Sequence, residues 1–251
     1  MALGDKKRIL MEEDIGVVDM VPDGSITAAK LAADVDYKAV NAAPAGLSTN
    51  LNLYVATTGS DETGKGSQSN PFATIQHAVD SIPKLTNGKS VVIQVAPGTY
   101  AENVQISGFA GSVNIFAQDE NNKPVISGHI NGTATGSVYL DSLIVEGKVF
   151  VSLGCVMNIL RCEVHSSGST AVNCTFGGTV YIDSCTVTAT ATGNYEGAIL
   201  AQRGCCYVSS TSITEETVMG LSAVYGTIFV LGNVTNNAQT EKTTYAGKIF
   251  T

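Results

Sequence analysis

The sequence has no tryptophan, and charged residues make up only 14% of its 251 residues. An ordinary globular domain is about 25% charged, so this composition does not indicate an amphipathic helical fold. No apolar run approaches the roughly 18 residues of a membrane-spanning helix, and the opening MALGDKKRILMEED contains no apolar signal-peptide core. We therefore expect a soluble protein that is not secreted by a standard signal.

Basic residues are the minority of the charges, since 14 Lys and Arg stand against 22 Asp and Glu, for a formal net charge of −8. Such a surface disfavours nucleic acid and anionic membranes as partners. The chain has no phosphate-binding or dinucleotide-binding glycine motif. No second His stands at ligand spacing from His165, and His77 and His129 are isolated, so we expect neither a metal nor another cofactor.

A repeat dominates the second half of the chain. Glycines recur at positions 111, 136, 154, 178, 204 and 226, and a β-like run follows each of them. The runs share apolar residues at offsets 0, 2, 5 and 7. The matching sets are Val138-Leu140-Leu143-Val145, Met157-Ile159-Cys162-Val164, Val180-Ile182-Cys185-Val187 and, with one polar substitution, Cys206-Val208-Thr211-Ile213.

Short strands of this kind cannot bury their apolar side alone, so successive repeats must stack as rungs of a solenoid. Each rung would pair in parallel with the next at about 4.8 Å, with glycine at the corners. The predicted fold class is therefore all-β, a single-stranded parallel β-helix of about six or seven rungs from residue 91 to 234. Apolar residues at helical spacing predict a helix over residues 71–82 that caps the first rung.

The six cysteines fit this solenoid as packing residues. Cys162 and Cys185 take the same inward offset in neighbouring repeats, and Cys155 and Cys205 each follow a corner glycine. Because the chain shows no secretory signal, we expect free, buried thiols rather than disulfides.

The first fifty residues differ in character from the rest. They combine a basic and an acidic cluster with a linker-like segment near residues 42–50, and their apolar content is too low for an independent core. We interpret residues 1–50 as an extended N-terminal attachment arm and residues 51–251 as the β-helix domain. The alternative is a disordered leader without a role.

Three segments between residues 51 and 106 resemble the pectin-lyase-like right-handed parallel β-helix proteins. They read LYVATTGSD at 53–61, NPFATIQHAVD at 70–80 and VIQVAPGTYAENV at 92–104. A further segment, PDGSITAAKL at 22–31, resembles one in bacteriophage fibre proteins, where it joins a virion-binding N-terminus to a distal domain. Together the resemblances imply a right-handed parallel β-helix in a phage fibre or spike, a class of protein that is usually trimeric.

Enzymes of the resembled fold include pectate lyases, polygalacturonases and pectin methylesterases, so the fold alone does not decide function. The chain shares with pectin methylesterases the motif GTYAE at 98–102 and a turn similar to theirs at 201–204. It departs from them at Tyr181, where their pattern has a catalytic Asp, and in lacking the Trp of their substrate motif. The departures disfavour esterase activity.

Asp141, Arg161 and Asp183 are the candidate catalytic residues, because we expect them at one outward offset in three successive repeats. Two carboxylates that face one substrate can act as acid and base in glycan hydrolysis. Charges of alternating sign can instead form a structural ladder on a solvated face, and the alternation favours this second interpretation.

Four outward residues between inward apolar positions are candidate ligand-binding residues, since polar and aromatic side chains on a rod suit sugar recognition. The alternative is that they pack between the subunits of a trimer. They are Tyr139, Asn158, Tyr181 and Tyr207.

The sequence thus predicts a virion structural protein, a head or tail fibre or spike subunit, rather than an enzyme. Residues 1–50 would bind a capsid or baseplate protein, and the β-helix, as a homotrimer, would adhere to a glycan of the host surface or environment. The alternative function is a small polysaccharide-degrading lyase or hydrolase of the β-helix class.

Overall fold

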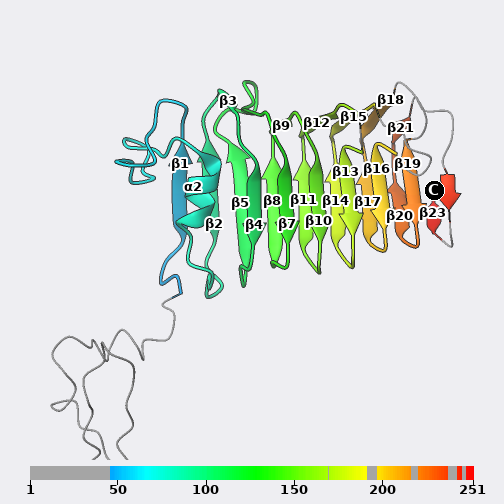
Figure 1. Cartoon of the computed structure of the whole chain (residues 1–251), viewed down its shortest axis with the longest axis horizontal. Helices are drawn as coiled ribbons and strands as arrows, with labels where there is room; N and C mark the ends of the chain where they lie inside the picture. The colour runs from blue at the N-terminus through cyan, green and yellow to red at the C-terminus, as the bar shows by residue number, and fades with distance from the viewer. Residues whose placement is uncertain (1–45, 169, 191–196, 216–219, 237–241, 245–246) are drawn as a thin grey trace, which may run out of the picture. The chain divides into compact units, whose positions relative to one another are not determined.

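From residue 46 onward the chain winds through three parallel β-sheets (Figure 1). The computed structural model describes residues 46–168, 170–190, 197–215, 220–236, 242–244 and 247–251. Residues 1–45 lie outside this range, and the predicted attachment arm falls almost entirely among them. All the strand pairs of the described part are parallel, as the repeat predicts.

Each turn of the chain adds one strand to each sheet, and we name the sheets A, B and C in the order the chain visits them. Sheet A has nine strands, β1 (Leu51–Val55), β2 (Val91–Val95), β5 (Ser112–Ala117), β8 (Ser137–Asp141), β11 (Val156–Leu160), β14 (Thr179–Asp183), β17 (Cys205–Ser209), β20 (Thr227–Leu231) and β23 (Lys248–Phe250). Sheet B has β3 (Thr99–Tyr100), β6 (Val125–Ile126), β9 (Ile144–Val145), β12 (Glu163–Ser166), β15 (Thr186–Ala189), β18 (Ser212–Glu215) and β21 (Thr235–Asn236). Sheet C has β4 (Val104–Ser107), β7 (Ile130–Thr133), β10 (Val149–Ser152), β13 (Val172–Thr175), β16 (Ile199–Gln202), β19 (Leu221–Val224) and β22 (Lys242–Thr244).

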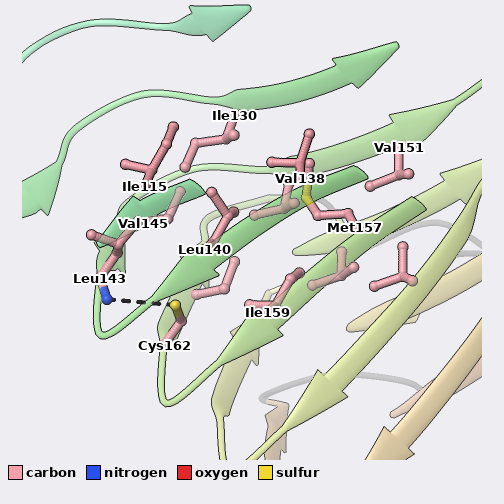
Figure 2. Packing of buried hydrophobic residues seen from close by; sticks show 14 of the residues in the cluster. Ile115, Ile130, Val138, Leu140, Leu143, Val145, Val151, Met157, Ile159 and Cys162 are labelled. Carbon is pink, nitrogen blue, oxygen red and sulfur yellow. Dashed lines mark hydrogen bonds between the residues drawn. The ribbon is translucent and has the colours of Figure 1, made fainter. Parts of the chain in front are cut away.

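The apolar offsets of the repeat form inward columns. Met157 of β11 is aligned with Val138 of β8 on one side and with Val180 of β14 on the other, and all three are fully buried. Figure 2 shows such side chains stacked between the sheets. The all-β, right-handed parallel β-helix predicted from the sequence is therefore confirmed.

The cysteines pack inside this core. Cys162 and Cys185 are 1% and 4% exposed and lie on neighbouring rungs, where Cys162 Sγ accepts a hydrogen bond from the Leu143 amide at 3.5 Å (Figure 2). Burial raises the pKa of the Cys185 thiol to about 11. Cys205 departs from the prediction, because it is only half-buried. All six thiols are free.

The marker glycines allow close approach between rungs. A Cβ atom on Gly136 would lie 2.3 Å from the Gly111 carbonyl oxygen, and one on Gly226 would lie 2.5 Å from that of Ala201. Positive φ angles fall instead on the residue before several of these glycines, including Arg203 at 57° and Tyr225 at 53°. Glycine is thus needed for space at positions 136, 178, 204 and 226, whereas Gly154, with φ 77° and no atom within 4 Å of a Cβ, is needed for its backbone conformation.

The capping helix is shorter than predicted. The helix α2 spans Ile75–Asp80 and begins after Thr74, whose hydroxyl caps it by accepting a hydrogen bond from the His77 amide. Phe72 lies outside it, because its backbone pairs with β1 through hydrogen bonds of 3.0 Å to Tyr54 and 2.9 Å from Ala56. The apolar side chain at position 72 therefore belongs to a strand-like segment.

The helix α2 covers the first free strand edge of sheet C. The Gln105 amide of β4 donates to Gln76 Oε1 at 2.6 Å, and Gln76 Nε2 lies 3.4 Å from the Gln105 carbonyl oxygen. One glutamine side chain thus takes the place of a neighbouring strand, which protects an edge that would otherwise be open to pairing.

Candidate functional site

The outward face of sheet A carries the predicted ligand-binding residues in one column. The sequence analysis found the first four members and missed the last two, although the strand period applies to all of them. The strand register places side by side, in this order, Tyr139, Asn158, Tyr181, Tyr207, Phe229 and Phe250.

The last four rings of this column stack face to face. The ring centroids of Tyr181 and Tyr207 are 4.6 Å apart, and those of Tyr207 and Phe229 are 5.0 Å apart, with interplanar angles of 8° and 10°. Phe229 and Phe250 follow at 5.1 Å and 11°. Because Tyr207 and Phe229 use both faces on their neighbours, they can offer only ring edges to a ligand. A role of this column in sugar binding stays a prediction.

Asp141 and Arg161 form an ion pair at the end of β8. Arg161 Nε donates to Asp141 Oδ1 at 2.9 Å, and Arg161 Nη2 contacts Asp141 Oδ2. The Ser142 hydroxyl also donates to Asp141 Oδ1, at 3.0 Å. Three donor groups of two residues converge on a carboxylate whose side chain is only 19% exposed, so its position is well defined.

The predicted outward offset of Arg161 is wrong. The register aligns Leu160, not Arg161, with both Asp141 and Asp183. Arg161 is the next residue, at the left-handed corner between sheets A and B with φ 50°, and its long side chain reaches back to Asp141. The sequence pattern misplaced Arg161, because the alternation of inward and outward side chains holds only within a strand. Arg161 lies at a corner, after the strand has ended.

Of the two predicted catalytic carboxylates, Asp141 contacts the Arg161 guanidinium and Asp183 does not. Among the described residues, Arg161 makes its side-chain ion pair with Asp141, whereas Asp183 is bonded at 3.3 Å by the hydroxyl of Ser184. Arg161 is linked to Asp183 through the main chain, since its amide donates to the Asp183 carbonyl oxygen at 3.1 Å. A ladder in which Arg161 neutralises both carboxylates is therefore not formed.

The Asp141–Arg161 pair lines a cavity of about 380 Å³ on the outer side of sheet A. We call it the acidic cleft, because it contains three carboxylates and one guanidinium. Its polar walls can hydrogen-bond to the hydroxyl and carbonyl groups of a sugar. Its lining residues are Gln94, Phe116, Ala117, Gln118, Asp119, Glu120, Asp141, Ser142 and Arg161.

The motif GTYAE has a structural role here. Glu102 accepts hydrogen bonds from the amides of Ile75 and Gln76 at the start of α2, both at 2.8 Å. The Tyr100 hydroxyl donates to the Ala96 carbonyl oxygen at 2.8 Å, and burial, together with the nearby Glu102 charge, raises the pKa of Tyr100 to about 12. The sequence analysis missed this structural role of the motif, which links α2 to the first rung.

Sheet C contains a group of buried polar side chains. Thr170 Oγ1, Asn173 Oδ1 and Thr175 Oγ1 are buried on or beside β13 and have no hydrogen-bond partner among the described residues. None of the three side chains is titratable, so this group offers no acid or base. No sequence signal distinguished these residues from ordinary strand positions.

The described residues offer no cluster of three or more His, Cys, Asp or Glu side chains that could hold a metal ion. Where the structure describes the chain, it contains no helix with the length and hydrophobicity needed to cross a membrane.

The right-handed parallel β-helix is the fold of the pectin-lyase-like proteins. The family model described as Pectinesterase matches residues 61–200, which include α2 and the acidic cleft. The chain belongs to the pectinesterase family.

Curated relatives are similar over a shorter stretch. Pectinesterase 1 and Pectinesterase 2 of Olea europaea are 36% and 35% identical to this chain over 88 residues, and the pectinesterase of Parthenium hysterophorus is 35% identical over the same length. Each alignment covers 34% of this chain and 23% of the relative, so the chain spans less than a quarter of their length. A solved rhamnogalacturonan lyase matches 80% of this chain and 62% of its own at 12% identity and a TM-score of 0.41, a likeness too low to carry an argument.

The family match overturns three predictions. The phage fibre or spike function is wrong, because the β-helix matches pectinesterases. The preference for a non-enzyme is wrong for the same reason, and so is the virion location. The misleading segment, residues 22–31, lies outside the described residues. The homotrimer, the capsid or baseplate partner and the glycan partner stay predictions.

Proposed function

We propose that this chain is a carbohydrate esterase that hydrolyses methyl esters on the uronate units of a pectin-type polysaccharide. The observation that carries the proposal is the Asp141–Arg161 pair in the acidic cleft, within the residues that match the pectinesterase family. The relatives' names support the substrate class.

Asp141 would act as the general base. Its carboxylate accepts a proton from a water molecule, whose oxygen attacks the ester carbonyl carbon. Arg161 stays protonated at any physiological pH, and an N–H group that is not bound to Asp141 can donate to the carbonyl oxygen as negative charge develops there. The bond to the methoxy group then breaks, and methanol leaves with the proton that Asp141 took up.

Charge in the cleft favours release of the product. An ester is neutral, but the new uronate is an anion beside the carboxylates of Asp119 and Glu120, which line the same cavity. Like charges in one cavity repel each other, so the neutral ester binds more favourably than the anionic acid that replaces it.

The test is methanol release from methyl-esterified polygalacturonan by the purified full-length chain. Asp141→Asn should lower the rate at least about 100-fold, because the amide cannot accept the proton. Asp183→Asn is the matched control, since Asp183 is aligned with the same Leu160 from the other side but does not line the cleft. Thermal unfolding of each variant controls for folding.

Wild-type activity in Asp141→Asn would refute the assignment of the base. A chain that releases no methanol, but produces reducing or unsaturated ends from the same polymer, would instead be a glycan-cleaving hydrolase or lyase and would refute the esterase proposal.

A further inference from the structure

Four of the six cysteines lie at the corner where the chain passes from sheet C to sheet A, on three successive rungs. Cys155 precedes β11, Cys174 lies in β13, and Cys205 and Cys206 begin β17. All of them are free thiols, and none lines the acidic cleft. The reaction proposed above therefore does not use these nucleophilic groups.

The side chain of Cys174 points toward the next rung. Its thiol donates to the Cys205 carbonyl oxygen at 3.4 Å, although the residue aligned with Cys174 in sheet C is Ala201. A Cβ atom on Gly204 would lie only 2.7 Å from Cys174 Sγ, so this glycine leaves room for the sulfur. The sulfur of Cys174 thus lies diagonally across the corner, beside the first residues of β17.

Cys206 is the residue of β17 whose thiol contacts this sulfur. It is fully buried, unlike the half-buried Cys205 before it, and its thiol hydrogen-bonds to that of Cys174. The hydrogen bond from Cys206 lowers the pKa of Cys174 by more than burial raises it, which favours the thiolate. Two sulfur atoms in contact, one of them with thiolate character, are suited to form a bond.

The other two cysteines, Cys162 and Cys185, are buried on neighbouring rungs but have different partners. The Cys185 thiol donates to the carbonyl oxygens of Ile159 at 3.3 Å and Asp183 at 3.1 Å. Cys162 Sγ accepts from the Leu143 amide at 3.5 Å (Figure 2). Because main-chain groups occupy both sulfurs, this pair is a matched control for Cys174 and Cys206.

We propose that Cys174 and Cys206 form a disulfide when the chain meets a peroxide, which reaches them through local opening of the strands. The Cys174 sulfur attacks one peroxide oxygen, the O–O bond breaks, and hydroxide leaves as water with the thiol proton. The Cys206 sulfur then attacks the sulfur of the resulting sulfenic acid, the S–O bond breaks, and a second water leaves with the Cys206 proton. The two thiols lose two electrons, and one hydrogen peroxide is reduced to two water molecules.

The disulfide joins sheet C of one rung to sheet A of the next, so these rungs cannot separate at the corner. It also restricts the unfolded chain, which raises the stability of the folded state. Neither thiol lines the acidic cleft, so the disulfide does not depend on the proposed esterase function.

The test treats the purified full-length chain with hydrogen peroxide and maps its peptides by mass spectrometry without reduction. We expect a cross-link between the peptides that contain Cys174 and Cys206. The unfolding temperature should rise by about 5 °C, and dithiothreitol should reverse both changes. Reversal distinguishes the disulfide from methionine sulfoxide, which a thiol reagent does not reduce under these conditions.

Three variants assign the bond. Cys206→Ser should lose the cross-link and the rise in unfolding temperature, whereas Cys185→Ser, in the control pair, should keep both. Since Cys205 is adjacent to Cys206 and shares its peptide, Cys205→Ser identifies the partner and should keep the cross-link.

A wild-type chain without this cross-link after oxidation would overturn the inference, as would a cross-link from Cys174 to Cys155 or Cys205. Equally fast cross-linking of Cys162 to Cys185 would also overturn it, because burial on neighbouring rungs would then be sufficient. The wild-type map decides the first two outcomes even if Cys206→Ser does not fold.

Discussion

The carboxylate of Glu102 lies 2.8 Å from the amide nitrogen of Ile75, and its second oxygen lies at the same distance from the amide of Gln76. These amides belong to the first turn of α2 and have no partner within the helix. A side chain that follows the second strand of sheet A along the chain therefore stabilises the helix that precedes that strand.

Replacing Glu102 with Gln should lower the free energy of unfolding by about 1–2 kcal/mol, because the amide can accept only one of the two hydrogen bonds and leaves the other N–H group of α2 without its partner. Urea unfolding measures the change. Glu62→Gln, at an exposed position in the neighbouring loop, is the control and should be neutral. Methanol release per folded molecule should stay at the wild-type level, and a specific loss of activity would show that Glu102 takes part in the reaction.

Much of the β-helix could be predicted because its determinants are periodic. An inward position such as Ile159 must be apolar in every rung, so its repetition is visible in the sequence and fixes the register with Leu140 and Ile182. Cys162 and Cys185 could be placed for the same reason. The limits of α2 could not, because Phe72 satisfies a helical spacing while its backbone pairs with β1.

The site was only partly predictable, because its geometry depends on residues that leave the repeat. Asp141 and Arg161 were named, but their pairing arises from a left-handed corner and a flexible side chain. The loop residues Asp119 and Glu120 follow no period, so nothing in the pattern placed them in the acidic cleft. The functional class was misjudged because a short segment outside the β-helix was given more weight than the motifs within it.

Asp61 should make the stability of this end of the β-helix depend on pH. Burial raises the pKa of its carboxyl, but hydrogen bonds from the Thr74 hydroxyl at 2.7 Å and from the amides of Thr74 and Ala73 outweigh burial, so the net pKa is lowered. Because the folded pKa lies below the unfolded one, the stabilisation is present above about pH 4 and is lost as the pH falls through the folded value.

Unfolding free energies measured between about pH 6 and pH 3 check this dependence, since they span the ordinary pKa of an Asp. Asp61→Asn should be less stable than the wild type near pH 6 and should lose less stability on acidification. Glu102 provides a contrast of opposite sign, because burial raises its pKa and the two amide hydrogen bonds offset this only in part. Its stabilising effect therefore decreases as the pH rises, and Glu102→Gln should make the acid loss steeper. If the free energies of unfolding of Asp61→Asn and wild type changed with pH in parallel, Asp61 would not be the source of the pH dependence.

Large side chains occupy left-handed corners between sheets C and A. Phe176 has φ 45° and is 56% exposed, and Leu153 has φ 52° and is 57% exposed. A non-glycine residue in this region is strained by about 1–2 kcal/mol, and an exposed ring recovers little of that by packing.

Phe176→Gly should therefore raise the free energy of unfolding by about 0.5–1 kcal/mol, because relief of the strain exceeds the added chain entropy of glycine in the unfolded state. The backbone hydrogen bond from the Phe176 amide to the Gln202 carbonyl oxygen, at 3.2 Å, is kept in the variant. Phe72→Gly is the control, because Phe72 is 6% exposed and has no positive φ, so it should lose about 3–5 kcal/mol. Urea unfolding curves give both changes in the free energy of unfolding, provided that each variant has the same slope as the wild type. A loss of stability in Phe176→Gly would mean that packing of the ring at this corner outweighs the strain of its backbone.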